Sequence, residues 1–146
     1  MNQTQITQIE SSFPLVAPIA EPAAAIFYRR LFERDPALRP LFRDTDMAVQ
    51  GRKLMQAIGF VVAHLRVPDR LLPAVSALGA RHAGYGVQPA HYDTVGAALL
   101  DTLEEGLGEA FTPEVREAWA AAYGLLAQVM ITAANDEDGV MAQSVA

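Results

Sequence analysis

The chain has 146 residues, of which 51% are hydrophobic and 19% charged, and it contains no cysteine. This size and composition predict one globular domain, residues 1–146, with a substantial hydrophobic core. The lack of cysteine excludes disulfides, thiolate zinc sites and iron–sulfur clusters, and it suits a cytoplasmic protein. The formal net charge of −6 argues against a nucleic-acid partner. No apolar run is long enough to span a membrane, and residues 1–10 carry no secretion signal.

The first third of the chain has helical hydrophobic spacing, with prolines separating the segments. A first helix is predicted over approximately residues 3–20, bent or broken by Pro14 and Pro18. A second helix is predicted to start near Pro22 and to end before Asp35, because Pro36 follows. Two prolines within residues 36–42 then indicate one tight helical turn.

The remainder of the chain is predicted to form four longer helices, over approximately residues 46–65, 69–82, 88–107 and 113–134. Thr45 or Asp46 is the expected N-cap of the first of these helices, Asp69 of the second and Thr112 of the last. From Asn135 the chain is polar, and a frayed tail is expected. Seven or eight helices of unequal length indicate an all-α fold that is not a simple four-helix bundle.

His82 is the histidine that the pattern singles out. It follows Leu71, Val75 and Leu78 at three- and four-residue spacing, so it lies on the apolar face of its helix. A buried histidine needs a partner for each ring nitrogen. The spacing alone allows two interpretations: a core histidine bonded to a backbone carbonyl, or a metal ligand.

Tyr28 and Gln50 are polar residues on otherwise apolar helix faces. Tyr28 lies between Phe27 and Leu31, so its ring should be buried and its hydroxyl needs a partner, which is most simply a backbone carbonyl. Gln50 precedes Leu54 on its helix face, and it either lies at the rim of the protein or points an amide into a pocket. The pattern itself does not separate these alternatives.

Several segments in combination are distinctive of one family. They are IFYRRLFERDPALRPLF, QGRKLMQAI, LLPAVSALGARHAGYGV, HYDTVGAALLDTLEEGLG and AWAAAYGLLAQV. In this order they resemble the bacterial single-domain haemoglobins and the globin half of flavohaemoglobins, over approximately residues 7–131. The resemblance implies an all-α globin fold that encloses a haem pocket.

The resemblance also implies roles for individual residues around a haem b cofactor. His82 matches the ligand of the haem iron, and Phe42 matches the aromatic residue that wedges the haem in place. Tyr28 and Gln50 match the side chains that donate hydrogen bonds to bound dioxygen, and Leu54 shapes the same pocket. Arg81 is expected to pair with a haem propionate. The other haem contacts expected from the resemblance are Ile58, Leu78, Val87, Tyr92, Val95 and Tyr123.

Two departures from the family pattern bear on redox chemistry. Tyr92 matches the family's tyrosine beside the iron-ligand histidine, but Ala134 aligns where the family usually has an acid; a small shift would bring in Asp136 or Glu137. Without that carboxylate, peroxidase-like and redox chemistry should be weaker. The sequence also ends with the globin part, so turnover is expected to need an external reductase.

The resemblance leaves four functions to compare. Reversible binding of dioxygen for storage or delivery is favoured over nitric oxide dioxygenation, which would convert nitric oxide and dioxygen to nitrate and would need re-reduction in each cycle. A gas or redox sensor is less favoured because no output domain is attached, and a helical protein without a cofactor is the fourth alternative. A monomer and a homodimer are both compatible with the sequence.

Overall fold

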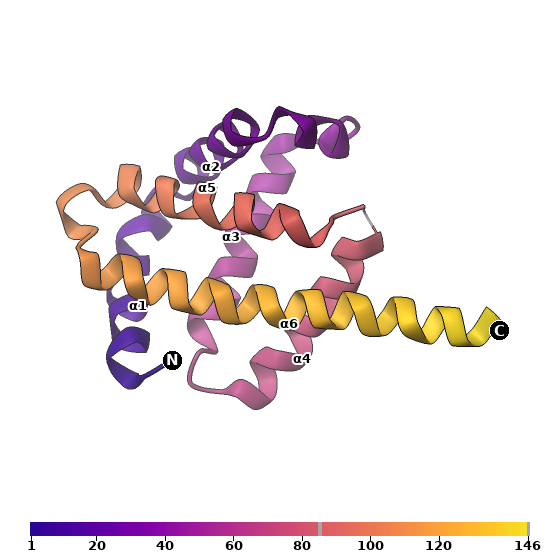
Figure 1. Ribbon diagram of the computed structural model, residues 1–146. Helices are drawn as coiled ribbons and strands as arrows, with labels where there is room; N and C mark the ends of the chain where they lie inside the picture. Colours follow the sequence, from indigo (N-terminus) through magenta and orange to yellow (C-terminus); the bar gives the residue numbers. More distant parts are fainter. Residues whose placement is uncertain (85, 146) are drawn as a thin grey trace.

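The computed structural model in Figure 1 describes the backbone of residues 1–84 and 86–145 and, within that part, the side chains up to Asn135. The described part contains six α-helices and three 3₁₀ segments, and no strand. In chain order they are α1 (Gln3–Val16), η1 (Ala17–Ile19), α2 (Ala20–Arg34), η2 (Pro36–Phe42), α3 (Met47–Ala63), α4 (Pro68–Gly84), α5 (Pro89–Leu107), η3 (Gly108–Ala110) and α6 (Pro113–Val145). The predicted all-α class is therefore confirmed.

The described residues contain fewer α-helices than the seven or eight expected, because the segment of residues 36–42 is a 3₁₀ helix. The first helix ends at Val16 rather than near residue 20, and Pro18 lies in the 3₁₀ segment that follows. Asp69 was expected as an N-cap but lies within the first turn of α4, which begins at Pro68. Proline suits the first position of a helix, because a backbone N–H at that position has no carbonyl partner within the helix.

The end of the chain also differs from expectation. Where the sequence predicted a frayed tail from Asn135, the backbone of α6 is helical to Val145. Thr112 begins this helix as expected, and its hydroxyl accepts a hydrogen bond from the Val115 backbone N–H at 3.2 Å. Once nucleated, a helix gains one hydrogen bond for each added residue, and no proline interrupts the stretch after Pro113.

The helices pack in two groups around α5 and α6, which run antiparallel beside each other in Figure 1. Helix α6 covers α1 and α4, whereas α2 packs against α5 and α3. Arg34 on α2 joins α5 through two hydrogen bonds to Asp101, at 2.7 and 3.0 Å. Arg29 and Arg30 both contact Glu105 one turn further along α5. These exposed ion pairs add orientation more than stability.

Two hydrophobic clusters form the interior of the described residues. Most buried residues of the main core, Ile9 and Trp119 among them, come from α1, α4, α5 and α6, and Ala23 of α2 and Leu65 join them. The second cluster, here called the aromatic cluster, lies between α2, η2, α3 and α5. Its buried members are Phe27, Tyr28, Leu31, Leu38 and Ala98, and the half-buried residues packed against them include Phe32, Phe42, Leu54 and Val95.

Candidate functional site

Tyr28 is the polar centre of the aromatic cluster. Its residue is only 8% exposed, and its ring meets Phe27 edge-on with centroids 4.9 Å apart. Phe42 makes a second edge-on contact at 5.5 Å and Phe32 a third contact at 6.2 Å. The ring is therefore held by packing on several sides, which leaves the hydroxyl little freedom.

The Tyr28 hydroxyl has a side-chain partner in Gln50. Burial raises the pKa of Tyr28 above the usual tyrosine value, and a hydrogen bond with Gln50 acts in the opposite direction. A hydrogen bond that lowers a phenol pKa favours the charged form of the phenol over the neutral form. Gln50 itself is half-buried in the first turn of α3.

The α2–α3 crossing explains how residues 22 positions apart meet. At Gly51 a β-carbon would lie 2.9 Å from the Ala24 β-carbon, so glycine lets the two helices approach closely next to Gln50. Asp46, as predicted, caps α3 by accepting hydrogen bonds from the backbone N–H groups of Ala48 and Val49, at 3.0 and 3.3 Å. The first turn of α3, which contains Gln50, is therefore held by the Asp46 cap before Gln50 and by the close contact at Gly51 after it.

Phe42, Leu54 and Val95 pack against the same cluster as Tyr28. All three are half-buried and pack against the aromatic cluster. Phe42 lies at the end of η2, and its ring also meets Phe32 edge-on at 5.6 Å. The surroundings of Tyr28 in this cluster are therefore apolar.

His82 is half-buried two residues before the end of α4. Its Nδ1 lies 2.8 Å from the Leu78 backbone oxygen. A carbonyl can only accept, so Nδ1 donates in this contact; in the neutral tautomer with that proton, Nε2 is the nitrogen that can bind a metal. That tautomer and orientation are what a histidine ligand of iron requires. The donor set therefore fits a haem.

The chain turns sharply after His82. The Val87 backbone N–H donates to the His82 carbonyl at 3.2 Å, and Gly86 has a φ of 87°, which favours glycine. Val87 and Leu78 are half-buried, whereas Arg81 is exposed.

Tyr92 and Tyr123 meet where α5 crosses α6. The Tyr123 hydroxyl donates a 2.5 Å hydrogen bond to the Tyr92 backbone oxygen. Burial raises the pKa of both phenols, and the neighbouring Tyr92 and Asp93 raise the pKa of Tyr123 further. Ala134 is half-buried on α6, and the side chains of Asp136 and Glu137 lie outside the described part.

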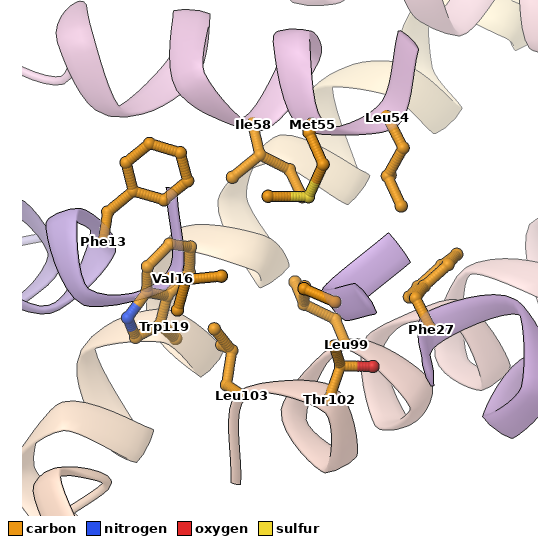
Figure 2. Close-up of a pocket in the computed structure, with 11 residues that line it drawn as sticks. Phe13, Val16, Phe27, Leu54, Met55, Ile58, Leu99, Thr102, Leu103 and Trp119 are labelled. Carbon is orange, nitrogen blue, oxygen red and sulfur yellow. The ribbon is translucent and has the colours of Figure 1, made fainter. Parts of the chain in front are cut away.

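Ile58 faces a different environment from the other predicted haem contacts. It packs against the main core and lines an apolar cavity, together with Met55 and Trp119 (Figure 2). Sequence reasoning did not identify this cavity, because its lining comes from five helices. It also left out Phe27, although its position next to Tyr28 was a usable signal.

Comparison with known proteins is decisive about the family. The Globin family model matches residues 25–130, which include Tyr28, Gln50, His82 and Tyr123. This chain belongs to the globin family. The resemblance found in the sequence and the fold that it implied are thereby confirmed.

The relatives of this globin are flavohemoproteins. The chain is 36% identical to one from Vibrio cholerae over 143 residues, and 35% identical to one from Rhodopirellula baltica over 133 residues. These matches cover 97% and 90% of this chain but 35% and 33% of the relatives, so the chain spans about a third of their length.

A solved structure has the same fold as this globin. It is an engineered carbene transferase made from a proposed nitric oxide dioxygenase of Rhodothermus marinus. The TM-score is 0.87 at 30% identity, and the match covers 97% of this chain and 99% of the other. The family and the flavohemoprotein relatives imply a haem cofactor. No helix in residues 1–84 or 86–145 has the length and hydropathy needed to cross a membrane.

Proposed function

We propose that this globin binds haem b through His82 and binds dioxygen reversibly beside Tyr28 and Gln50. The observation that carries the proposal is the burial of Tyr28 among the rings of Phe27, Phe32 and Phe42, with Gln50 as a polar neighbour of its hydroxyl. A structural tyrosine would more simply bond a backbone carbonyl. A tyrosine oriented by a glutamine amide is instead suited to donate its proton to a small polar ligand.

The residues have distinct tasks in this proposal. When bound, ferrous haem supplies an iron that takes up diatomic gases reversibly. His82 would hold the iron with Nε2, and its Nδ1–H bond to the Leu78 carbonyl would keep the ring oriented. Tyr28 would donate its O–H to the gas, with Gln50 fixing the direction of that bond. Leu54 and Phe42 would exclude water and thereby strengthen it.

The remaining predicted contacts are part of the same proposal. The tyrosine pair of α5 and α6 would form the far wall of the haem pocket, and Arg81 would pair with a propionate. The other proposed wall residues are Ile58, Leu78, Val87 and Val95. We also propose a cytoplasmic location, which the absence of cysteine supports.

A haemin titration of the purified protein tests this function. Stoichiometric binding should produce a sharp Soret band that shifts on reduction with dithionite. The band should shift again under oxygen and return under argon. The proposal would be contradicted if the protein took up no haemin. It would also be contradicted if oxygen oxidised the reduced haem protein and argon did not restore the reduced spectrum.

Nitric oxide dioxygenation is the second candidate. The flavohemoprotein relatives and the solved structure favour it. It needs a reductant in each cycle, so the test adds nitric oxide to the oxygenated protein with and without a flavin reductase and its nicotinamide. Nitrate formed over many turnovers with the reductase would favour the enzyme. One equivalent per haem, whether or not the reductase is present, would favour oxygen binding.

A further inference from the structure

Helix α4, which carries His82, is held in the fold mainly by α6. Within the part of the chain that the structure describes, α6 is the only element with which α4 makes an extensive contact, and Figure 1 shows the two helices crossing. The buried residues of α4 are Leu71, Val75 and Gly79, which recur at four-residue spacing and so share one face of the helix. The position of α4, and of any residue on it, therefore depends on how this helix meets α6.

Gly79 lies directly against the backbone of α6. A β-carbon at this position would lie 2.5 Å from both the Cα and the carbonyl oxygen of Met130, and 2.8 Å from the Met130 carbonyl carbon. Among the described glycines, Gly79 is the one whose added β-carbon would meet backbone atoms, so no side-chain rotation can make room for it. Carbon atoms in ordinary contact are about 3.5–4.0 Å apart, so an alanine here would need the two helices to separate by roughly 1 Å.

This crossing lies less than one turn of α4 before His82. A helix rises 1.5 Å per residue, so His82 follows Gly79 at about 4.5 Å along the helix axis. The contact of the His82 Nδ1 with the Leu78 carbonyl, at 2.8 Å, holds the ring against its own helix. The imidazole should therefore move together with α4 when α4 moves relative to α6.

We propose that Gly79 positions His82 for the haem iron, by setting the distance between α4 and the α6 backbone at Met130. The proposal deepens the proposed function and rests on it. A ligand must be held within about 0.5 Å of its productive position, and an opening of roughly 1 Å at the crossing exceeds that tolerance. Gly79 is a positioning residue, because it acts only through the histidine that the same helix carries.

Haemin titration of Gly79→Ala, followed by the Soret band, tests the proposal. Loss of the group that orients a metal ligand typically weakens metal binding 10–100-fold, so this variant should bind haemin about tenfold or more weakly than the unmodified protein. The matched control is Gly84→Ala, two residues after His82 on the same helix, where a β-carbon meets no atom within 4 Å. The control should bind haemin as the unmodified protein does. Equal haemin affinity in the two variants would overturn the proposal.

A His82→Gly background separates positioning of the histidine from general damage to the fold. In this background haemin, with or without added imidazole, no longer binds through a side chain that α4 carries. Adding Gly79→Ala should therefore leave the haemin affinity of the His82→Gly protein unchanged, because the two positions act as one unit. The same loss of haemin affinity in both backgrounds would show that Gly79 supports the pocket as a whole, and it would overturn the positioning role.

A second variant covers the case in which Gly79→Ala does not fold. Val75→Ile adds one methylene to the same buried face of α4, one turn before the crossing, and a flexible side chain overpacks less severely than a methyl group against backbone. This variant should also weaken haemin binding, and the weakening should again disappear in the His82→Gly background. Where Gly79→Ala does not fold, unchanged haemin affinity in Val75→Ile overturns the proposal.

A measurement without haem checks the crossing itself. In the NMR spectrum of the unmodified protein, the α-protons of Gly79 and Met130 should give a nuclear Overhauser effect, and its absence would overturn the proposal. The haemin titrations distinguish this proposal from the proposed function. Failure of the unmodified protein to bind haemin would contradict the proposed function, whereas undiminished haemin binding by a folded Gly79→Ala protein would contradict the role of Gly79 alone.

Discussion

The Tyr123 hydroxyl donates a 2.5 Å hydrogen bond to the Tyr92 backbone oxygen, and this bond ties α6 to the first turn of α5. The contact depends on Gly96, one turn further along α5. A β-carbon there would lie 2.7 Å from the Tyr123 ring. The missing side chain of Gly96 therefore makes the space in which the Tyr123 ring lies.

Gly96→Ala should destabilise the protein by about 1–3 kcal/mol, because the added methyl group overpacks the Tyr123 ring. The matched control is Gly124→Ala on α6, where a β-carbon meets no atom within 4 Å. That change should stabilise by about 0.4–1 kcal/mol, since alanine is a better helix former. Urea unfolding monitored by circular dichroism compares the two. Equal effects would mean that Gly96 does not position Tyr123.

Alkaline pH should unfold the protein cooperatively. Burial raises the pKa of Tyr28, Tyr92 and Tyr123 in the folded state above the usual 10.0. The unfolded chain therefore loses these protons first, and the stability present below pH 10 is lost as the pH rises above it. Between pH 10 and its folded-state pKa, the strongly shifted Tyr123 should lower the free energy of unfolding by about 1.4 kcal/mol per pH unit.

Tyrosinate absorbance measured beside circular dichroism checks this pH dependence. The phenols should ionise together with the loss of helix rather than before it. Ionisation of all the tyrosines near pH 10 with the helices intact would contradict the buried positions of these rings.

Tyr28→Phe should speed dioxygen dissociation from the haem-loaded protein about tenfold or more, because a hydrogen bond to a charged partner is worth about 1.5–3 kcal/mol. Gln50→Leu should have a smaller effect, since Gln50 acts through Tyr28 in our proposal. Stopped-flow displacement of oxygen by carbon monoxide measures both. The double variant should be no faster than Tyr28→Phe alone. Additive effects would show that each residue donates to the gas independently.

His82→Ala should weaken haemin binding about a hundredfold or more, because the iron loses its protein ligand. His64→Ala is the control. The His64 ring stacks on Phe60 with centroids 4.1 Å apart, and its Nδ1 bonds the Phe60 carbonyl just as His82 bonds that of Leu78. Soret titration compares the two variants. Unchanged binding in His82→Ala would assign the iron to another residue.

The sequence by itself determined the order and approximate limits of the helices. Local chemistry sets these limits: Pro36 cannot continue α2, Asp46 accepts from the free N–H groups of α3, and Thr112 with Pro113 begins α6. The predicted end of the first helix was less exact, because more than one proline in that segment could end it. The break between α1 and α2 falls after Val16, although Pro14 is tolerated inside α1.

Only the tertiary structure decided which polar groups meet. In the sequence, Tyr28 could bond a carbonyl and Gln50 could lie at the rim; the close α2–α3 crossing at Gly51 makes them neighbours. The apolar cavity likewise needs walls from five helices. Helix limits depend on neighbours a few residues away, whereas these contacts depend on how distant helices cross, and no local pattern encodes that.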